Sequence, residues 1–345
     1  MGGDHGPSIV IPGLVFAVER LSGRDVRFLV HGDEAVIGPE LARFPTLKDK
    51  VEIRHTDKFI TMDVKPSQAM RRGKGTSLWN AVESVKSGDA NAAVSAGNTG
   101  AMMAISMLLL RLAAEIKRPA LTASWPTSKG VTTVLDVGAN VESDAEQLVE
   151  FAIMGAAFHH AIQGKDRPTV GLLNVGSEEQ KGHDDVRQAH ALLRGTEFEF
   201  DYHGFVEGDD IAKGTVDVVV TDGFTGNVLL KTAEGVARFF GAEIRSTFTS
   251  GPFALAGAVL ASRALGRMRQ RMDPGAVNGA PLLGLNGVVV KSHGSADAKS
   301  FASAVKVAVD LASSDFAAEI DRNVKRLSAV LADPAQEGSI VESSQ

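Results

Sequence analysis

Short runs of β-branched and aliphatic residues recur along the chain, and nearly all of them end in glycine or a small polar residue. Runs of this length and composition are typical of strands buried inside a sheet. Between them the apolar positions recur at helical spacing. The expected strands are residues 25–32, 50–56, 91–97, 131–139, 168–176, 216–223 and 287–294, and the expected helices are 76–87, 100–115, 143–163, 184–194, 227–248, 296–314 and about 316–331.

This alternation predicts an α/β fold with a doubly wound, mostly parallel sheet and helices on both of its faces. Ligands of such sheets bind beyond the carboxyl ends of the strands. No internal repeat divides the chain, so we expect one catalytic domain over residues 1–345. Its last residues, 332–345, are expected to be a loose tail.

Five loops share one composition, rich in Gly, Asn, Thr and Asp, which is typical of an anion-binding turn. Glycine lets backbone N–H groups converge, and a following helix N-terminus adds positive charge. We expect all five at one edge of the sheet. The first loop lacks a preceding strand, so we expect about six to ten apolar residues upstream of residue 1. The loops are residues 2–6 (GGDHG), 95–101 (SAGNTGA), 135–143 (LDVGANVES), 220–227 (VTDGFTGN) and 291–297 (KSHGSAD).

Composition narrows the choice of ligand. The 345 residues include 36 glycines and no cysteine, which excludes disulfides, zinc–thiolate sites and a thiol nucleophile. The net charge of −6 gives no support to a nucleic-acid partner. Neither G-x-G-x-x-G nor G-x-x-x-x-G-K-[ST] occurs, so the dinucleotide fingerprint and the P-loop are absent. We therefore expect a small phosphate, or a nucleotide bound in another manner, with no cofactor and no metal.

Two further side chains could also contact an anion. Lys181, in the loop NVGSEEQKGHDD, could neutralise a phosphate or simply pair with Glu178. The acidic residues of this loop could bind a metal, although a solvated helix start explains them as well. His293 follows an expected strand and could donate a hydrogen bond to an anion, or cap a helix.

Six motifs taken together resemble the bacterial phosphate acyltransferases of phospholipid synthesis, the acyl-carrier-protein:phosphate transacylases. They are MGGDHGP, SAGNTGA, LDVGAN, LLNVGSEEQKG, DGFTGNVLLKTAEG and GAPLLGLNGVVVKSHGS, in order, from residue 1 to about 315. The chain departs from the family pattern in two places. No strand precedes the first motif, and His183 stands where the family usually has Asn.

The resemblance implies a fold related to the isocitrate dehydrogenase and phosphotransacetylase group, and a homodimer. It implies transfer of a long-chain acyl group from acyl-carrier protein (ACP) to inorganic phosphate. The acyl phosphate would feed a membrane acyltransferase that acylates glycerol 3-phosphate. It also implies a cytoplasmic enzyme that associates peripherally with the membrane.

This reaction needs little acid–base catalysis from side chains. Phosphate, with a second pKa near ~6–7, is already partly dianionic, and a thiolate with a pKa near ~8.5 leaves without a strong acid. Positioning and oxyanion stabilisation remain, so we expect direct attack without an acyl-enzyme. The candidate catalytic residues are Lys181, His293 and Asn98. The candidate phosphate or substrate contacts are Gly3, Asp4, Gly97, Thr99, Gly100, Asp136, Asn140, Asn174, Asp222, Thr225, Gly226 and Asn227.

Residues 235–280 are expected to form a protruding helical hairpin for dimer, membrane or ACP contact. Within residues 253–272, basic side chains recur every four residues on one helical face, opposite an apolar one. This pattern fits either a helix packed in a dimer or a basic amphipathic helix on an anionic membrane or ACP. The expected contact residues are Arg263, Arg267, Arg271, Leu265 and Met268.

Three alternatives remain open. A short-chain, CoA-dependent phosphotransacetylase would share the chemistry but would not need residues 253–272. A dehydrogenase of the isocitrate type would share the sheet, but the missing dinucleotide fingerprint and acidic metal-ligand set argue against it. A non-catalytic lipid- or ACP-binding module would leave the glycine loops without a function.

Overall fold

Every expected strand and helix forms, with ends shifted by a few residues. The computed structural model describes residues 1–113, 115–271, 275 and 277–332. Its elements are α1 (Pro7–Arg20), β1 (Phe28–Gly32), α2 (Glu34–Ala42), the 3-10 turn η1 (Pro45–Leu47), β2 (Val51–His55), α3 (Pro66–Arg72), α4 (Ser77–Ser87), β3 (Ala92–Ser95), α5 (Thr99–Leu110), β4 (Ala120–Pro126), β5 (Val131–Leu135), α6 (Ala145–Gln163), β6 (Thr169–Leu173), α7 (Asp184–Gly195), β7 (Asp201–Val206), α8 (Gly208–Lys213), β8 (Val218–Val220), α9 (Gly223–Phe248), α10 (Pro252–Arg271), β9 (Ala280–Leu283), β10 (Val288–Lys291), α11 (Ala298–Ala312) and α12 (Phe316–Leu331).

The sheet contains three strands that the hydrophobic pattern did not predict. Within the described residues its order is β3-β10-β9-β4-β5-β8-β6-β7, and β1 and β2 form a separate parallel pair. The unpredicted strands are β4, β7 and β9. β9 is short and contains Pro281, and β4 mixes small and polar residues, so neither resembles a buried parallel strand. The expectation of a mostly parallel sheet with helices on both faces is confirmed.

β4 and β9 reverse the direction of the sheet at its centre. The pairs β10–β9, β9–β4 and β4–β5 are antiparallel, whereas β3–β10, β5–β8, β8–β6 and β6–β7 are parallel. The carboxyl ends of β3 and β10 therefore lie at the edge opposite to those of β5, β8 and β6. The expectation that all five glycine loops share one edge is wrong, because it assumed a sheet without these reversals.

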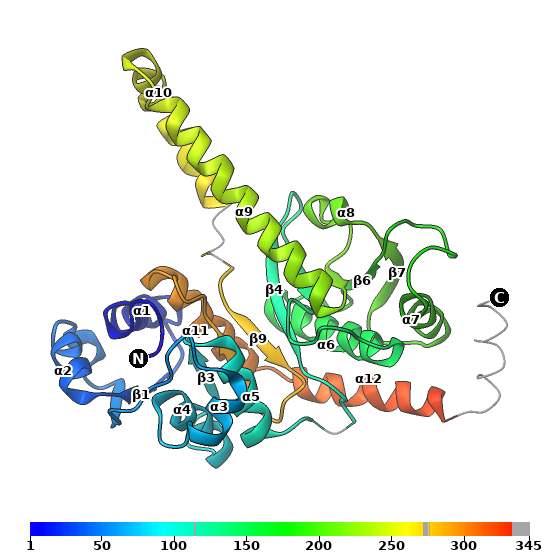
Figure 1. Ribbon diagram of the computed structural model, residues 1–345, viewed down its shortest axis with the longest axis horizontal. Helices are drawn as coiled ribbons and strands as arrows, with labels where there is room; N and C mark the ends of the chain where they lie inside the picture. The colour runs from blue at the N-terminus through cyan, green and yellow to red at the C-terminus, as the bar shows by residue number, and fades with distance from the viewer. Residues whose placement is uncertain (114, 272–274, 276, 333–345) are drawn as a thin grey trace.

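Register shows which helices share a face of the sheet. Leu121 of β4 pairs with Leu282 of β9, and paired residues point to the same face. Leu282 packs in a buried cluster with α4 and α5, and Leu121 packs with α8 and the start of α9. The neighbouring Leu283 points the other way, into a cluster with α6, α11 and α12. Thus α5 and α9 lie on one face and α6 on the other (Figure 1).

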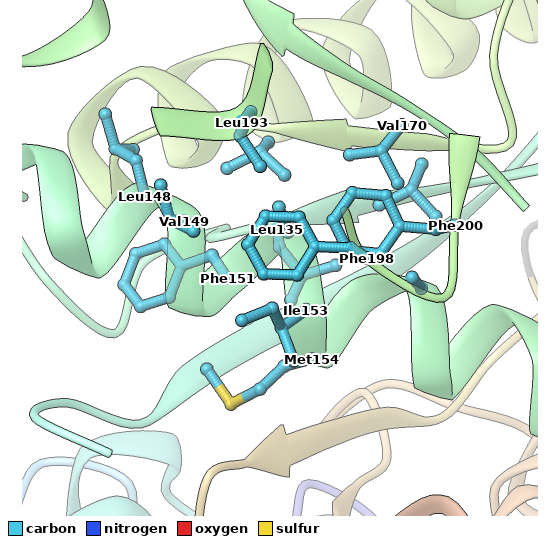
Figure 2. Packing of buried hydrophobic residues seen from close by; sticks show 14 of the residues in the cluster. Leu135, Leu148, Val149, Phe151, Ile153, Met154, Val170, Leu193, Phe198 and Phe200 are labelled. Atoms are coloured by element: carbon cyan, nitrogen blue, oxygen red, sulfur yellow. The ribbon is translucent and has the colours of Figure 1, made fainter. Parts of the chain in front are cut away.

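The largest buried cluster surrounds α6, which is apolar on nearly all sides because it lies between the sheet and other helices. Figure 2 shows Phe198 and Phe200 beside Val170 and Leu193, and the two rings stack with centroids 5.0 Å apart. A side chain at Gly155 of α6 would meet Val218 and Leu135 at under 3.0 Å. Glycine here allows α6 to approach the sheet closely.

A carboxyl group is buried in this cluster. Glu150 of α6 accepts a hydrogen bond from the Lys117 backbone N–H at 3.0 Å, and burial raises its pKa from 4.5 to about 7. The folded chain then holds a proton that the unfolded chain releases between pH 4.5 and about 7. The contribution of Glu150 to stability therefore falls as pH rises through this window.

Replacement of Glu150 by Gln should remove this pH dependence, because the amide stays neutral and can still accept the Lys117 bond. We expect Glu150→Gln to be about 1–3 kcal/mol more stable than the wild type at pH 8, and the difference to vanish near pH ~4, below the unfolded pKa. Urea unfolding at both pH values measures it. Glu83→Gln, on the exposed surface of α4, is the control. An equal difference at both pH values would contradict the prediction.

Candidate active site

A lysine side chain is buried at the carboxyl end of β10. Lys291 is 7 % exposed, and its Nζ donates a hydrogen bond to the Ser292 carbonyl. Because Lys291 pairs with Ala280 of β9, two residues before Leu282, its side chain points to the face shared by α5 and α9. Burial lowers its pKa from 10.5 to about 8; Asp4 opposes this shift and Lys231 of α9 adds to it.

The glycines of the first loop allow close packing. A side chain at Gly2 would overlap the Ile60 carbonyl oxygen, and one at Gly3 would lie 3.0 Å from the Ala96 carbonyl oxygen. This packing places the Asp4 carboxylate beside the turn after β10. Its Oδ2 lies 3.3 Å from the point that a Cβ atom would occupy if Gly294 carried a side chain. Asp4 thus lies near Lys291, as its effect on the lysine pKa also indicates.

Asn278 fixes the turn that follows β10. Its Oδ1 accepts a hydrogen bond from the His293 N–H at 3.1 Å, and its Nδ2 donates to Ser292 Oγ at 2.9 Å. The His293 Nδ1 accepts the Ser295 backbone N–H at 3.2 Å, so the neutral ring carries its proton on Nε2. His293 is exposed and can present this N–H to a ligand.

Both the amide nitrogen and the amide oxygen of the Asn98 side chain form hydrogen bonds within the chain. Its Nδ2 donates to the carbonyl oxygens of Thr61, Met62 and Val64 at 2.9–3.2 Å, and its Oδ1 accepts the Ala101 N–H at 2.9 Å. Asn98 therefore caps α5 and holds the 61–64 segment against it. This geometry gives it a positioning role and does not favour the catalytic role expected for it.

The first turn of α5 is open to a ligand beside this clamp. The backbone N–H groups of Thr99 and Gly100 occupy the first two helical positions, which have no intrahelical partner, and Thr99 is exposed. Gly97, in contrast, donates its N–H to Ser95 Oγ at 3.1 Å. A side chain at Gly100 would lie 2.8 Å from the Pro66 ring, so glycine here lets α3 approach.

The loop after β5 encloses an anion of its own. The buried Asp136 carboxylate accepts backbone N–H groups from Leu121, Gly138, Ala139 and Asn140 at 2.7–3.1 Å, together with the Asn140 Nδ2 at 2.9 Å. Burial raises the pKa of this carboxyl, and these donors oppose the shift. The amides expected to hold phosphate already hold Asp136. For Asp136 and Asn140 the structure favours a structural role over phosphate contact.

The motif DGFTGN forms the start of α9 rather than a free loop. Asp222 caps the helix, accepting the Thr225 N–H at 2.8 Å and the Thr225 hydroxyl at 2.7 Å. A side chain at Gly226 would overlap the Asp136 carbonyl oxygen. Asn227 is exposed, with its Cβ 3.5 Å from the position of a Cβ on Gly138. These residues seat α9 on the Asp136 loop, so a phosphate contact by Asp222, Thr225 or Gly226 stays a prediction that this geometry does not favour.

Lys181 lies in the loop after β6, at the same edge as the start of α9. Its Nζ pairs with Glu178 Oε1 at 2.8 Å, and this bond raises the lysine pKa. Asn174 Nδ2 donates to the Lys181 carbonyl at 3.0 Å, and His183 occupies the N-cap position of α7. Lys181 and Asn174 therefore belong to the edge opposite to His293 and Asn98.

α9 connects the two edges. It starts at the Asp136 loop, crosses the face of the sheet that it shares with α5, and then projects away from the domain (Figure 1). Its third turn brings Lys231 within electrostatic range of Lys291. Lys231 also pairs with Glu234 at 2.9 Å. Two cations, the first turn of α5 and the turn that holds His293 thus lie at the carboxyl ends of the neighbouring strands β3 and β10.

Sequence reasoning missed the two lysines of this site. Lys231 lies inside a helical stretch, and Lys291 ends an apolar strand. A signal was present for the second: period-2 alternation along VVVK places Lys291 on the same face as the buried Val289. A lysine on the buried face of a strand end needs a partner or a ligand.

α9 and α10 form the protruding hairpin (Figure 1). Near its tip Phe253 is 92 % exposed and Leu260 is 88 % exposed. Arg263 and Arg267 are exposed and make no ion pair among the described residues. Further exposed apolar side chains are Val236, Phe239, Phe240, Leu255, Val259 and Met268, whereas Leu265 is half-buried; the Arg271 side chain and residues 272–274 and 276 lie outside the described part. Among the described helices, none is long and apolar enough to cross a membrane.

A cavity of about 930 Å³ opens between β1 and β3. Strand backbone and aliphatic side chains form most of its wall, including Val30, Val94 and Val305. Its lining includes Arg24, Arg27 and Arg54 but neither Lys291 nor Lys231, so we place the anion beside the two lysines rather than in this cavity.

Comparison with known proteins agrees with this architecture. Solved structures similar in fold include a phosphotransacetylase from Streptococcus pyogenes, with a TM-score of 0.57 and 18 % identity over 87 % of this chain and 91 % of that one. A branched-chain phosphotransacylase from Enterococcus faecalis has a TM-score of 0.53 and 14 % identity, over 87 % of this chain and 94 % of that one. At these identities the likeness supports the fold alone, and the expected similarity in fold to phosphotransacetylases is confirmed.

Sequence comparison gives the family. A phosphate acyltransferase from Caulobacter vibrioides is 71 % identical, over 96 % of this chain and 92 % of the relative. A phosphate acyltransferase from Phenylobacterium zucineum is 59 % identical, over 97 % of this chain and 95 % of the relative. The model of a family described as "Fatty acid synthesis protein" matches residues 1–319. The chain is therefore a member of this fatty acid synthesis family and, like the relatives that it matches over nearly its whole length, a phosphate acyltransferase.

Proposed function

We propose that this phosphate acyltransferase moves a long-chain acyl group from ACP to inorganic phosphate, and that the acyl phosphate is consumed by a membrane enzyme that acylates glycerol 3-phosphate. The observation that carries the proposal is the buried Lys291, with Lys231 nearby and the open first turn of α5 beside it. Two cations and free backbone N–H groups suit a dianion such as phosphate.

In the proposed step, a phosphate oxygen attacks the thioester carbonyl carbon. The new C–O bond forms as the C–S bond breaks, and the electron pair leaves with the thiolate of the carrier. Lys291 and Lys231 hold the phosphate, and the Nε2–H of His293 donates to the carbonyl oxygen as it gains negative charge. The monoprotonated dianion needs no general base, and the thiolate takes a proton from water.

The roles of Lys181, Asn174 and Asn227 stay separate proposals. These side chains lie at the edge where α9 begins, opposite to His293 and Asn98. The hairpin is proposed to contact an anionic membrane surface through its exposed apolar tip and arginines, and to contribute to a homodimer. We further propose that the enzyme is cytoplasmic and binds peripherally to the membrane that uses its product.

The deciding experiment is phosphate-dependent thiol release from palmitoyl-ACP, with palmitoyl-CoA and acetyl-CoA assayed beside it. We expect release from palmitoyl-ACP that saturates with phosphate, and little from acetyl-CoA. Preference for acetyl-CoA would instead support the short-chain, CoA-dependent phosphotransacetylase. Absence of release from all three, with a folded protein, would contradict the proposal.

A further inference from the structure

One surface segment reverses the charge balance of this acidic protein. Residues 57–75, which include α3, hold five basic and two acidic residues, whereas the whole chain carries a net charge of −6. All five basic side chains are exposed, and none makes an ion pair among the described residues. They are Lys58, Lys65, Arg71, Arg72 and Lys74.

The same segment exposes large apolar side chains. Phe59, Met62 and Met70 are each exposed by 40–48 %. Aromatic residues, Met and Arg are enriched at protein interfaces, and an apolar group among charges of one sign is typical of a docking site for an oppositely charged protein. Neither feature is explained by packing within this chain.

The segment is fixed against the candidate site. Asn98 holds the carbonyl groups of Thr61, Met62 and Val64, and the Pro66 ring packs against Gly100 in the first turn of α5. The Met62 Cε lies 3.6 Å from the position of a Cβ on Gly294, in the turn after Lys291. A partner bound here would sit at the entrance to the phosphate site.

We propose that residues 57–75 form the docking surface for the acidic carrier protein that delivers the acyl thioester. The proposal rests on the proposed function and moves ACP docking from the hairpin to this segment. Unpaired basic side chains attract an acidic partner over long range, and Phe59 and Met70 give it an apolar contact. The thioester then enters beside Met62 and meets the phosphate near Lys291.

The position of residues 57–75 favours an acidic protein over an anionic membrane as the bound partner. The segment lies beside the entrance to the site, whereas the exposed apolar tip of the hairpin extends far from α3 (Figure 1). A carrier must bring its thioester to the phosphate, and a membrane need not approach the site at all. Vesicle binding is therefore included as an outcome of the test.

The test compares Arg72→Glu/Lys74→Glu with the matched control Arg27→Glu/Lys86→Glu, whose side chains are also exposed and unpaired among the described residues. The readout is the KM for palmitoyl-ACP divided by that for S-palmitoyl-pantetheine, a neutral thioester without the carrier. We expect this ratio to rise about tenfold or more in the first variant and to stay near the wild-type value in the control. Arg72→Gln/Lys74→Gln should give an intermediate rise, and added salt should shrink all differences.

Binding of fluorescent holo-ACP, measured by anisotropy, tests docking even if no turnover is seen. If the wild type binds holo-ACP and Arg72→Glu/Lys74→Glu does not, docking stands whatever the fate of the proposed reaction. If both bind equally, or if the ratio is unchanged, the docking proposal fails while the reaction can still be right. Loss of binding to phosphatidylglycerol vesicles with an unchanged ratio would overturn it in favour of a membrane surface.

Discussion

Replacement of Lys291 by Met is expected to lower kcat/KM for phosphate by about 10²–10³-fold, the range found when one preorganised electrostatic group is removed from an active site. Methionine fills much the same space without the charge. Burial lowers the pKa of Lys291 to about 8, so the folded chain pays a cost for the ammonium at neutral pH. Lys291→Met should therefore be at least as stable as the wild type at pH 7.

The pH profile separates a catalytic Lys291 from a structural one. Phosphate becomes dianionic as pH rises through ~6–7, and Lys291 loses its charge as pH rises through about 8. The wild-type rate with phosphate should thus show a bell-shaped dependence on pH, with the fall at high pH (the upper limb) centred near pH 8. Lys291→Arg keeps its charge at this pH and should lose the upper limb.

Lys231 provides a second check on the same profile. Its charge adds to the lowering of the Lys291 pKa. In Lys231→Met the upper limb should move to higher pH while phosphate binds more weakly. An upper limb at the same pH in wild type, Lys291→Arg and Lys231→Met, or a clear loss of stability in Lys291→Met, would contradict the assignment.

Replacement of Asp136 by Ala is expected to destabilise the protein by about 4 kcal/mol. Four backbone N–H groups and the Asn140 side chain donate to this buried carboxylate, and its removal leaves them without acceptors. Each buried donor left unsatisfied costs about 1–3 kcal/mol, and partial access of water reduces the sum. Asp136→Asn should also be destabilised, because its NH₂ group faces donors.

The start of α9 should loosen with this loop. A side chain at Gly223 would overlap the Asn140 carbonyl oxygen, which shows how closely the helix sits on it. Urea unfolding measures the stability, and limited proteolysis near residues 136–142 and 222–227 follows the loosening. Glu142→Ala, exposed in the same loop, is the control and should change stability by less than about 0.5 kcal/mol. Equal stability of Asp136→Ala and Glu142→Ala would show that the carboxylate does not hold the loop.

The candidate site was only partly predictable from sequence. Gly3, Asp4, Thr99 and His293 come from loops whose glycines mark close backbone packing, and the structure brings them to one edge. The Asp136 loop has the same composition but serves its own carboxylate. Composition cannot tell these cases apart, because a turn that encloses a phosphate and one that encloses an aspartate need the same residues.

The sequence by itself determined the order of the predicted strands and helices and the family, because hydrophobic periodicity and glycine turns are local properties of the chain. The tertiary structure decided where those elements meet. Two strands, β4 and β9, reverse the sheet and separate Lys181 from His293. α9 then brings Lys231 towards Lys291 across 60 residues of sequence. Strand direction and burial arise from contacts between distant residues, so no local pattern could show that a lysine ending an apolar strand faces the proposed phosphate site.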